Sequence, residues 1–353
     1  MENKRKYELS FANVLCCMAV IFIHVNSEAV NLLSRNTPQY AVIYLMWQAA
    51  SFVVYGFVFL SGIKQFLSIS KNGFNPAVFY KKRLLAIVVP YIMWVIAYYL
   101  YDCAVGNEVF SIKNVLYYMY SGDYVGHFYF VILIVQFYAL MPLWVWLFKR
   151  VSPVFMLVLS LLITVVFGQN YVSVIKVFVP GYEFGFSDRI FTTYLFYWTA
   201  GAYIGLNYDA AVRIFNKNKK FITAFFVVYS VFSLSAALVS SVFKRFSPCM
   251  EPVMMMYRIA AVMFMFSLSL GGAKNICRYK AVRLIDASSY NIYLSHCLVI
   301  KIVNRFFDDY GVWRLGMRYV IRFAAVYAVS IAVCVLYTSV KGKIKKIREN
   351  RHE

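Results

Sequence analysis

Apolar residues in this chain are gathered into long runs that short polar segments separate. The hydrocarbon core of a bilayer needs about 17–25 residues of helix. The segments between the runs are too short for an appended soluble domain, so the pattern predicts an all-α, polytopic membrane protein with one transmembrane domain over residues 1–353. Ten runs reach the required length, at residues 9–31, 41–63, 84–102, 128–148, 153–169, 190–206, 221–243, 253–272, 284–306 and 316–340.

Composition agrees with this interpretation, since 62% of the residues are hydrophobic, 19% are aromatic and the mean hydropathy is +0.65. The first run has a basic start and a Ser27-Glu28-Ala29 sequence that loosely resembles a signal-peptide cleavage site. However, the run is long enough to cross a membrane, which favours a first transmembrane helix over a cleaved signal.

The formal net charge of +21 does not indicate a nucleic-acid partner. Most lysines and arginines fall in short loops that would lie on one side of the membrane if the N-terminus is cytoplasmic. This positive-inside pattern predicts that both termini are cytoplasmic. The basic tail at residues 341–353 is then expected to contact anionic membrane lipid.

The first run carries three polar residues on one predicted helix face. Eleven residues separate Asn13 from His24, which is three turns plus about 20°, and Glu28 follows His24 at i+4. An ionisable residue inside a spanning helix indicates a functional site. The alternative is an interfacial histidine that lipid headgroups and water solvate near the helix end.

The ninth and fourth runs carry two further histidines. Ser289, Tyr293 and His296 follow one another at i, i+4 and i+7, so they share a helix face. His127 begins the fourth run on the predicted outer side. His296 could instead be a packing residue bonded to a carbonyl, and His127 could be an interfacial residue.

Two groups of cations could bind anions. Arg314, Arg318 and Arg322 share one face where the last run enters from outside, and they could hold a phosphate or carboxylate. Snorkelling to headgroups is the alternative, although Arg322 lies too deep for it. Lys82 and Arg83 precede the third run and could meet a nucleotide phosphate or serve only as topology signals.

The seven cysteines show no paired spacing, and most lie in apolar runs. We therefore expect neither a disulfide framework nor a metal site. The sequence also lacks a glycine-rich phosphate loop.

Five stretches, taken in order, resemble a known family. They are the aliphatic run that ends in His24, FVFLSGIKQF with Ser61 and Gly62, FYKKRLLAIVVPYIMW with Arg83 and Pro90, HFYFVILIVQFYALMPLW with His127 and Tyr129, and SSYNIYLSHCLVI with Tyr293 and His296. Together they resemble the acyltransferase 3 family of ten-helix membrane acyltransferases. The intercellular adhesion protein C type, a polysaccharide acyl- or succinyltransferase, looks especially similar.

The resemblance implies transfer of an acyl group, with acetyl favoured, from cytoplasmic acyl-CoA to a hydroxyl of a cell-surface polysaccharide or its lipid-linked precursor. No metal is implied, and the bacterial plasma membrane is the expected location. The implied catalytic residues are His24 as base or acyl carrier, Glu28 as the residue that orients the His24 ring, and His296 with Tyr293. The implied donor-binding residues are Asn13, Lys82 and Arg83, and the acceptor-binding residues are His127, Tyr129, Arg318 and Arg322.

One position departs from the family pattern. Many members carry arginine eleven residues before the histidine of the first helix, where this chain has Asn13. A neutral amide cannot pair with an anion, so another cation such as Arg83 would have to replace that charge. The departure slightly favours the rival hypothesis of a transporter that exports a glycan, lipid carrier or small molecule without acyl transfer. Acceptor identity and oligomeric state stay open.

Overall fold

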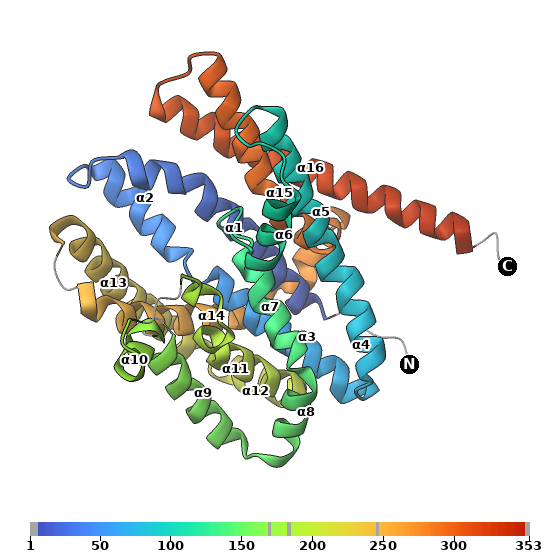
Figure 1. Ribbon diagram of the computed structural model, residues 1–353. Helices are drawn as coiled ribbons and strands as arrows, with labels where there is room; N and C mark the ends of the chain where they lie inside the picture. The colour runs from blue at the N-terminus through green and yellow to red at the C-terminus, as the bar shows by residue number, and fades with distance from the viewer. Residues whose placement is uncertain (1–5, 169–170, 182–184, 245–246, 350–353) are drawn as a thin grey trace. The chain divides into compact units, whose positions relative to one another are not determined.

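The computed structural model describes residues 6–168, 171–181, 185–244 and 247–349 (Figure 1). Lys4 and Arg5, which contribute to the predicted orientation, lie outside these residues. Helices account for most of the described chain, which contains no strand, so the predicted all-α class is confirmed.

The described chain divides into two compact units. Unit 1 comprises Met1–Val54 with Val212–Glu353, and unit 2 comprises Tyr55–Ala211. Whether they act as one domain stays a prediction. The helices of unit 1 are α1 (Tyr7–Leu32), α2 (Pro38–Ala49), α13 (Lys219–Phe243), α14 (Ser247–Cys277), α15 (Lys280–Asp309) and α16 (Leu315–Glu349), while α12 (Tyr208–Lys217) crosses the boundary.

Unit 2 contains shorter helical segments, several of which follow one another with little or no break. They are α3 (Val53–Asn72, which starts at the boundary), α4 (Pro76–Arg83), a π-helical turn η1 (Leu84–Val88), α5 (Val89–Ala104), α6 (Ile112–Ser121), α7 (Tyr129–Ala139), α8 (Met141–Arg150), α9 (Pro153–Phe167), α10 (Tyr171–Phe178), the 3₁₀ turns η2 (Ser187–Arg189) and η3 (Phe191–Tyr194), and α11 (Leu195–Leu206).

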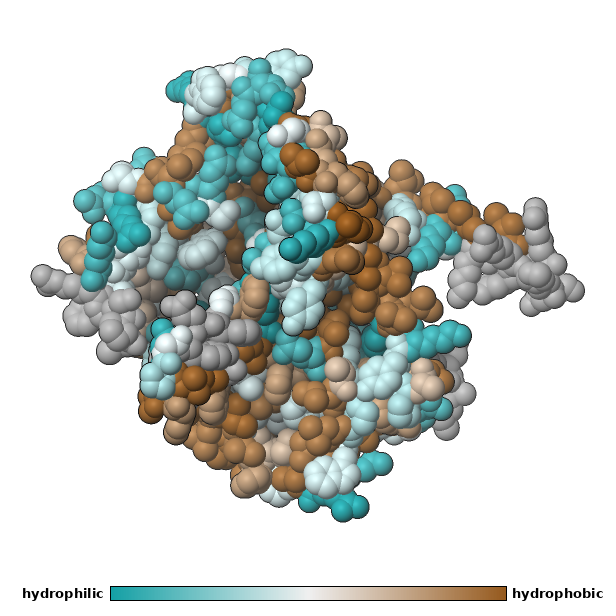
Figure 2. All heavy atoms as spheres, in the orientation of Figure 1, coloured by the Kyte–Doolittle hydropathy of each residue, from teal (hydrophilic) through white to brown (hydrophobic). Residues whose placement is uncertain are grey.

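Six helical stretches of the described chain are long and apolar enough to cross a membrane, and the bent pair α7–α8 would add a seventh. The predicted count of ten is therefore not confirmed. Predicted spans 153–169 and 190–206 correspond to the short helices α9 and α11, and span 284–306 lies within the more polar α15. Figure 2 shows apolar side chains gathered over α5 and α9, as expected of surfaces that face lipid.

Three helices begin at a polar residue followed by proline. Thr37, Asn75 and Ser152 each accept a hydrogen bond from a backbone N–H in the first turn of α2, α4 and α9, respectively. Proline fits the first helical position because it has no N–H to leave unpaired there. These dipeptides therefore fix where the three helices start.

Two prolines inside predicted spans change the helix geometry. Pro90 lies in the continuous helical stretch from Pro76 to Ala104, just after the π-helical turn Leu84–Val88. Because proline has no N–H to donate and its ring crowds the preceding turn, the hydrogen-bond ladder widens there. Pro142 follows the break between α7 and α8, whose axes bend by 54°.

Helix α1 is the central helix of unit 1, because it packs against α2, α14, α15 and α16. Its side chains Ala12, Cys16, Cys17, Ile21 and Val25 are fully buried. The same helix carries the predicted polar face, so that face must point into the protein rather than into lipid.

Unit 2 depends on close approach of α3 and α11. A Cβ at Gly201 would lie 2.2 Å from the carbonyl oxygen of Phe59, and one at Gly205 would lie 2.6 Å from that of Ile63. A Cβ at Gly62 would likewise lie 2.6 Å from the carbonyl oxygen of Trp198. Small residues permit such backbone contact between membrane helices, where dispersion rather than water exclusion drives packing.

Gly201→Val is expected to lower the thermal unfolding midpoint of the detergent-solubilised protein, at a cost of about 1–3 kcal/mol, because the new side chain must displace the backbone of α3. Gly272→Ala in α14 is the matched control, since a Cβ there meets nothing within 4 Å. Equal midpoints for the two variants would contradict close packing of α3 against α11.

Candidate functional site in unit 1

The histidines of the first and ninth predicted spans meet inside unit 1. The imidazole rings of His24 on α1 and His296 on α15 have centroids 5.0 Å apart and planes inclined by 52°. His296 is fully buried, whereas His24 is half-buried. Two residues far apart in sequence thus form one imidazole pair, which helical periodicity in either run could not reveal.

Hydrogen bonds fix the orientation of His296. Its Nδ1 lies 2.7 Å from the carbonyl oxygen of Tyr293 and 3.2 Å from that of Ile292. Carbonyls only accept, so Nδ1 carries the proton and donates. Its Nε2 is then the basic nitrogen of the neutral ring, and the Cys297 thiol lies 3.3 Å from it. The ring of Tyr293 lies 6.1 Å from the His296 ring.

His24, His296 and Cys297 form a group that could hold a soft metal ion. Their potential ligand atoms all lie within 4.8 Å of one another. Imidazole nitrogen and thiolate sulfur suit Zn²⁺ or a similar ion, although a fourth ligand would have to come from outside the group. The sequence predicts no metal site and gives no signal at Cys297, because only the turn of α15 brings this thiol to the ring.

Asn13 lies on the same side of α1 as His24 and joins α1 to α15. Its Nδ2 donates to Asp286 Oδ1 at 2.9 Å and to Ser289 Oγ at 2.8 Å. Asp286 was not foreseen as a partner, since nothing in its local sequence marks it. A donor-binding role for Asn13 stays a prediction, but the structure gives its amide two partners within the protein.

Glu28 lies one turn beyond His24 and pairs with two arginines of α16. Arg322 Nη2 forms an ion pair with its carboxylate, and Arg318 Nε lies 3.6 Å from Oε1. The Arg322 side chain is only 1% exposed, and that of Glu28 is 23% exposed. The role predicted for Glu28, orienting His24, stays a prediction.

Residues of α15 complete the environment of the two arginines. Arg322 Nε donates to Asn304 Oδ1 at 2.9 Å, and Arg318 Nη2 donates to Asp308 Oδ1 at 3.0 Å. Both guanidinium groups also lie over the ring of Phe307. The predicted role of the arginines in binding the acceptor stays a prediction, and their charges already have partners in α1 and α15.

The remaining predicted site residues belong to unit 2. His127 is buried next to Phe128, and its ring lies 6.3 Å from that of Tyr98. Tyr129 is half-buried at the first position of α7. The described contacts therefore place His127 in an aromatic environment within unit 2.

Polar contacts hold the loop that precedes α7. The Tyr124 hydroxyl donates to Asp102 at the end of α5, and Arg189 pairs with Asp123 at 3.2 Å and Asp188 at 2.9 Å. Burial and the hydrogen bond to Asp102 raise the pKa of Tyr124 above its usual value, so the phenol stays protonated. Burial lowers the pKa of Arg189, but the hydrogen bonds and charges of both aspartates outweigh it and raise the pKa overall.

Arg83 lines a groove of about 320 Å³ in unit 2. Its guanidinium lies between the rings of Phe79 and Tyr138, 5.4 Å from each centroid. The Tyr138 hydroxyl also contacts Ser61 Oγ at 2.9 Å. Lys82 is exposed and does not line the groove, so the two predicted donor-binding cations differ in position.

The apolar helices and these contacts define a multi-pass membrane protein with an imidazole pair inside unit 1. A family model for the acyltransferase domain matches residues 7–339, which is nearly the whole chain. The chain therefore belongs to the acyltransferase 3 family, and the resemblance inferred from the five stretches is confirmed.

Two kinds of relative are similar to this chain. A Bacillus subtilis protein named "Putative membrane-bound acyltransferase YfiQ" is 26% identical over 307 residues, covering 82% of this chain and 79% of the relative. A Staphylococcus aureus (strain N315) protein named "Probable poly-beta-1,6-N-acetyl-D-glucosamine export protein" is 22% identical over 318 residues, covering 84% and 83%. The family match and the first relative support acyltransferase activity. No solved structure matches the chain.

Arg322→Met is expected to lower the free energy of unfolding by about 2 kcal/mol or more, because it leaves Glu28 without its buried partner. The double variant Glu28→Gln/Arg322→Met should recover part of that loss in a double-mutant cycle. Thermal unfolding in detergent measures both.

The matched control is Arg305→Gln, which removes an ion pair with Asp309 whose two side chains are about half exposed. We expect a change below about 0.5 kcal/mol in this variant. A loss for Arg322→Met that is no larger would contradict a structural role for the buried pair.

Proposed function

We propose that this protein is an acyl-CoA-dependent O-acyltransferase of the bacterial plasma membrane. It would move an acyl group, with acetyl favoured, to a hydroxyl of a cell-surface polysaccharide or its lipid-linked precursor. The observation that carries this proposal is the pairing of His24 with His296 inside unit 1. Imidazole is the side chain best suited to exchange a proton with a hydroxyl near neutral pH.

In the proposed reaction His24 removes the proton of the acceptor hydroxyl as that oxygen attacks the thioester carbonyl. The new C–O bond replaces the C–S bond, and the coenzyme A thiolate leaves with the proton that His24 accepted. His296 supports the developing charge through the ring pair, since Tyr293 and Ile292 carbonyls hold its Nδ1 proton in place. The half-buried His24 is the ring of the pair that a substrate reaches more readily.

We assign the donor to the groove of unit 2 that Arg83 lines. Its lining combines the cations Lys81 and Arg83 with apolar side chains such as Leu84 and Val135. Coenzyme A presents the same combination, with phosphates at one end and a long, weakly polar arm that ends in the thioester.

Export without acyl transfer is the second candidate, and the Staphylococcus aureus relatives favour it because their names describe export of a polysaccharide. An exporter needs a path across the membrane but no base. The two functions therefore make opposite predictions for the histidine pair.

His24→Ala is expected to reduce transfer of labelled acetyl groups from acetyl-CoA to surface glycan by at least about 100-fold, as loss of a general base does. Membranes from cells that express the variant or the parent protein are incubated with the labelled donor. Unchanged thermal unfolding should accompany the loss, since His24 is only half-buried.

Retained acetylation in that variant would remove His24 from the reaction. Glycan that crosses vesicle membranes without label, in both the parent protein and the variant, would instead establish export.

Arg83→Gln is expected to raise KM for acyl-CoA by about tenfold with little change in kcat, because it removes one charge-assisted contact to a phosphate. Lys82→Gln is the comparison, and we expect a smaller effect because Lys82 lies outside the groove. A larger effect for Lys82 would assign the donor to the exposed face of α4 instead.

A further inference from the structure

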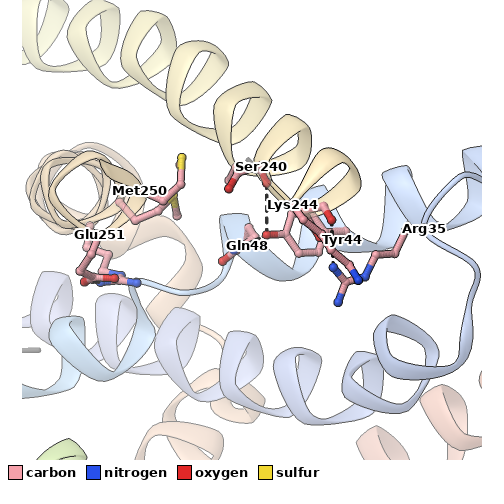
Figure 3. Close-up of a pocket in the computed structure, with 11 residues that line it drawn as sticks. Arg35, Tyr44, Gln48, Ser240, Lys244, Met250 and Glu251 are labelled. Carbon is pink, nitrogen blue, oxygen red and sulfur yellow. Dashed lines mark hydrogen bonds and ion pairs between the residues drawn. The ribbon is translucent and has the colours of Figure 1, made fainter. Parts of the chain in front are cut away.

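A cavity in unit 1 is lined by neither residue of the imidazole pair. It has a volume of about 440 Å³ and is formed where the loop after α1 and the helix α2 meet the C-terminal end of α13 and the N-terminal half of α14 (Figure 3). The predicted orientation of the chain puts these helix ends on the outer side of the membrane.

Cations dominate the charge of this cavity. Arg35, Lys244 and Arg258 line it, against the single carboxylate of Glu251. Arg258 forms an ion pair with Glu251, which neutralises that end. Arg35 Nη1 donates to the backbone carbonyl of Ser241, a neutral group, and no carboxylate in the described part of the chain pairs with Arg35 or Lys244.

Figure 3 shows Arg35 and Lys244 toward one end of the cavity and Glu251 toward the other. Two positive charges without a carboxylate partner therefore face the same end. A phosphate monoester carries between −1.5 and −2 charges at neutral pH, so it matches this end in charge as well as in hydrogen-bonding capacity.

The middle of the cavity offers neutral hydrogen-bonding groups. Gln48 Nε2 donates to the Tyr44 hydroxyl at 2.9 Å, and Ser240 lines the facing wall on α13. An amide, a phenol and an aliphatic hydroxyl are suited to the hydroxyl groups of a sugar. The Tyr44 ring, stacked on that of Tyr40 at 5.3 Å, adds an aromatic surface.

The backbone of Lys244 gives a separate reason to assign its side chain a function. Lys244 follows α13 with φ of 52°, the only positive φ at a non-glycine residue in the described chain. Glycine is the usual residue at a left-handed helix end because it has no Cβ. Here a long cationic side chain occupies that position and reaches the cavity.

We propose that this cavity binds a phosphorylated sugar, with the phosphate between Arg35 and Lys244 and the sugar against Tyr44, Gln48 and Ser240. The inference deepens the proposed function, on which it rests for the view that this sugar belongs to the acyl acceptor. Arg318 and Arg322 suit a phosphate less well, because Glu28 and Asp308 pair with them.

The test measures binding of glucose 1-phosphate to the full-length protein in phosphatidylcholine nanodiscs, without acyl donor. Lys244→Gly and Arg35→Gln should each weaken binding by about tenfold or more. Lys244→Gly relieves the left-handed backbone, so its unfolding midpoint should be equal to or above that of the parent protein. Lys220→Gln, in the exposed first turn of α13, is the control and should bind like the parent.

Two further probes identify the source of the phosphate. Glucose without phosphate should bind at least tenfold more weakly than glucose 1-phosphate. The binding measurement is repeated in nanodiscs of the anionic lipid phosphatidylglycerol. Loss of glucose 1-phosphate binding there would show that the lipid competes for the site, which would support the phosphate site and assign it to a lipid headgroup. Equal binding by the parent and Lys244→Gly, or by the two sugars, would overturn the proposal.

The binding assay omits the donor, so its outcome is independent of acyl transfer. Sugar-phosphate binding in a protein that transfers no acyl group would leave the cavity assignment intact and reject only the enzyme. Acyl transfer without such binding would reject only the cavity.

Discussion

The polar side chains of α1 must find their partners inside the protein, because the bilayer offers none. An unsatisfied polar group in hydrocarbon costs several kcal/mol. The Asn13 amide donates a hydrogen bond to Asp286 on α15, and the Asn26 side-chain carbonyl accepts one from the Tyr319 hydroxyl on α16. Between Asn13 and Asn26 along α1, the His24 ring contacts the His296 ring of α15. One turn beyond His24, Glu28 forms an ion pair with Arg322 of α16. The polar side chains of α1 therefore fix how α1, α15 and α16 pack, and the face that carries Asn13, His24 and Glu28 also builds the imidazole pair.

Neutralisation by carboxylates explains how Arg318 and Arg322 can be largely buried in unit 1. Each has a carboxylate partner, and the ring of Phe307 covers both guanidinium groups. At the opposite end of this face, Asp286 accepts a hydrogen bond from Asn13.

Unit 2 obtains its geometry from different residues. Glycines let α3 and α11 approach at backbone distance, and prolines widen or bend the helices that carry Arg83 and Tyr138. The groove beside Arg83 lies next to both distortions, since its lining comes from the π-helical turn and from the end of α7. Irregular backbone at membrane depth is tolerated where it lines a cavity or is buried in protein, and here it lines the groove to which we propose to assign the donor.

The sequence alone determined the helical class, the membrane location, the family and the helix face that holds Asn13, His24 and Glu28, because apolar run length and helical periodicity are local properties. Tertiary structure alone decided which groups meet. Cys297, Asp286 and Asn304 carry no local signal, yet each contacts a residue that the sequence did single out. The cavity around Arg35 and Lys244 could not be predicted from the sequence either. Its walls come from segments about 200 residues apart, and helical periodicity relates only residues that are close in sequence.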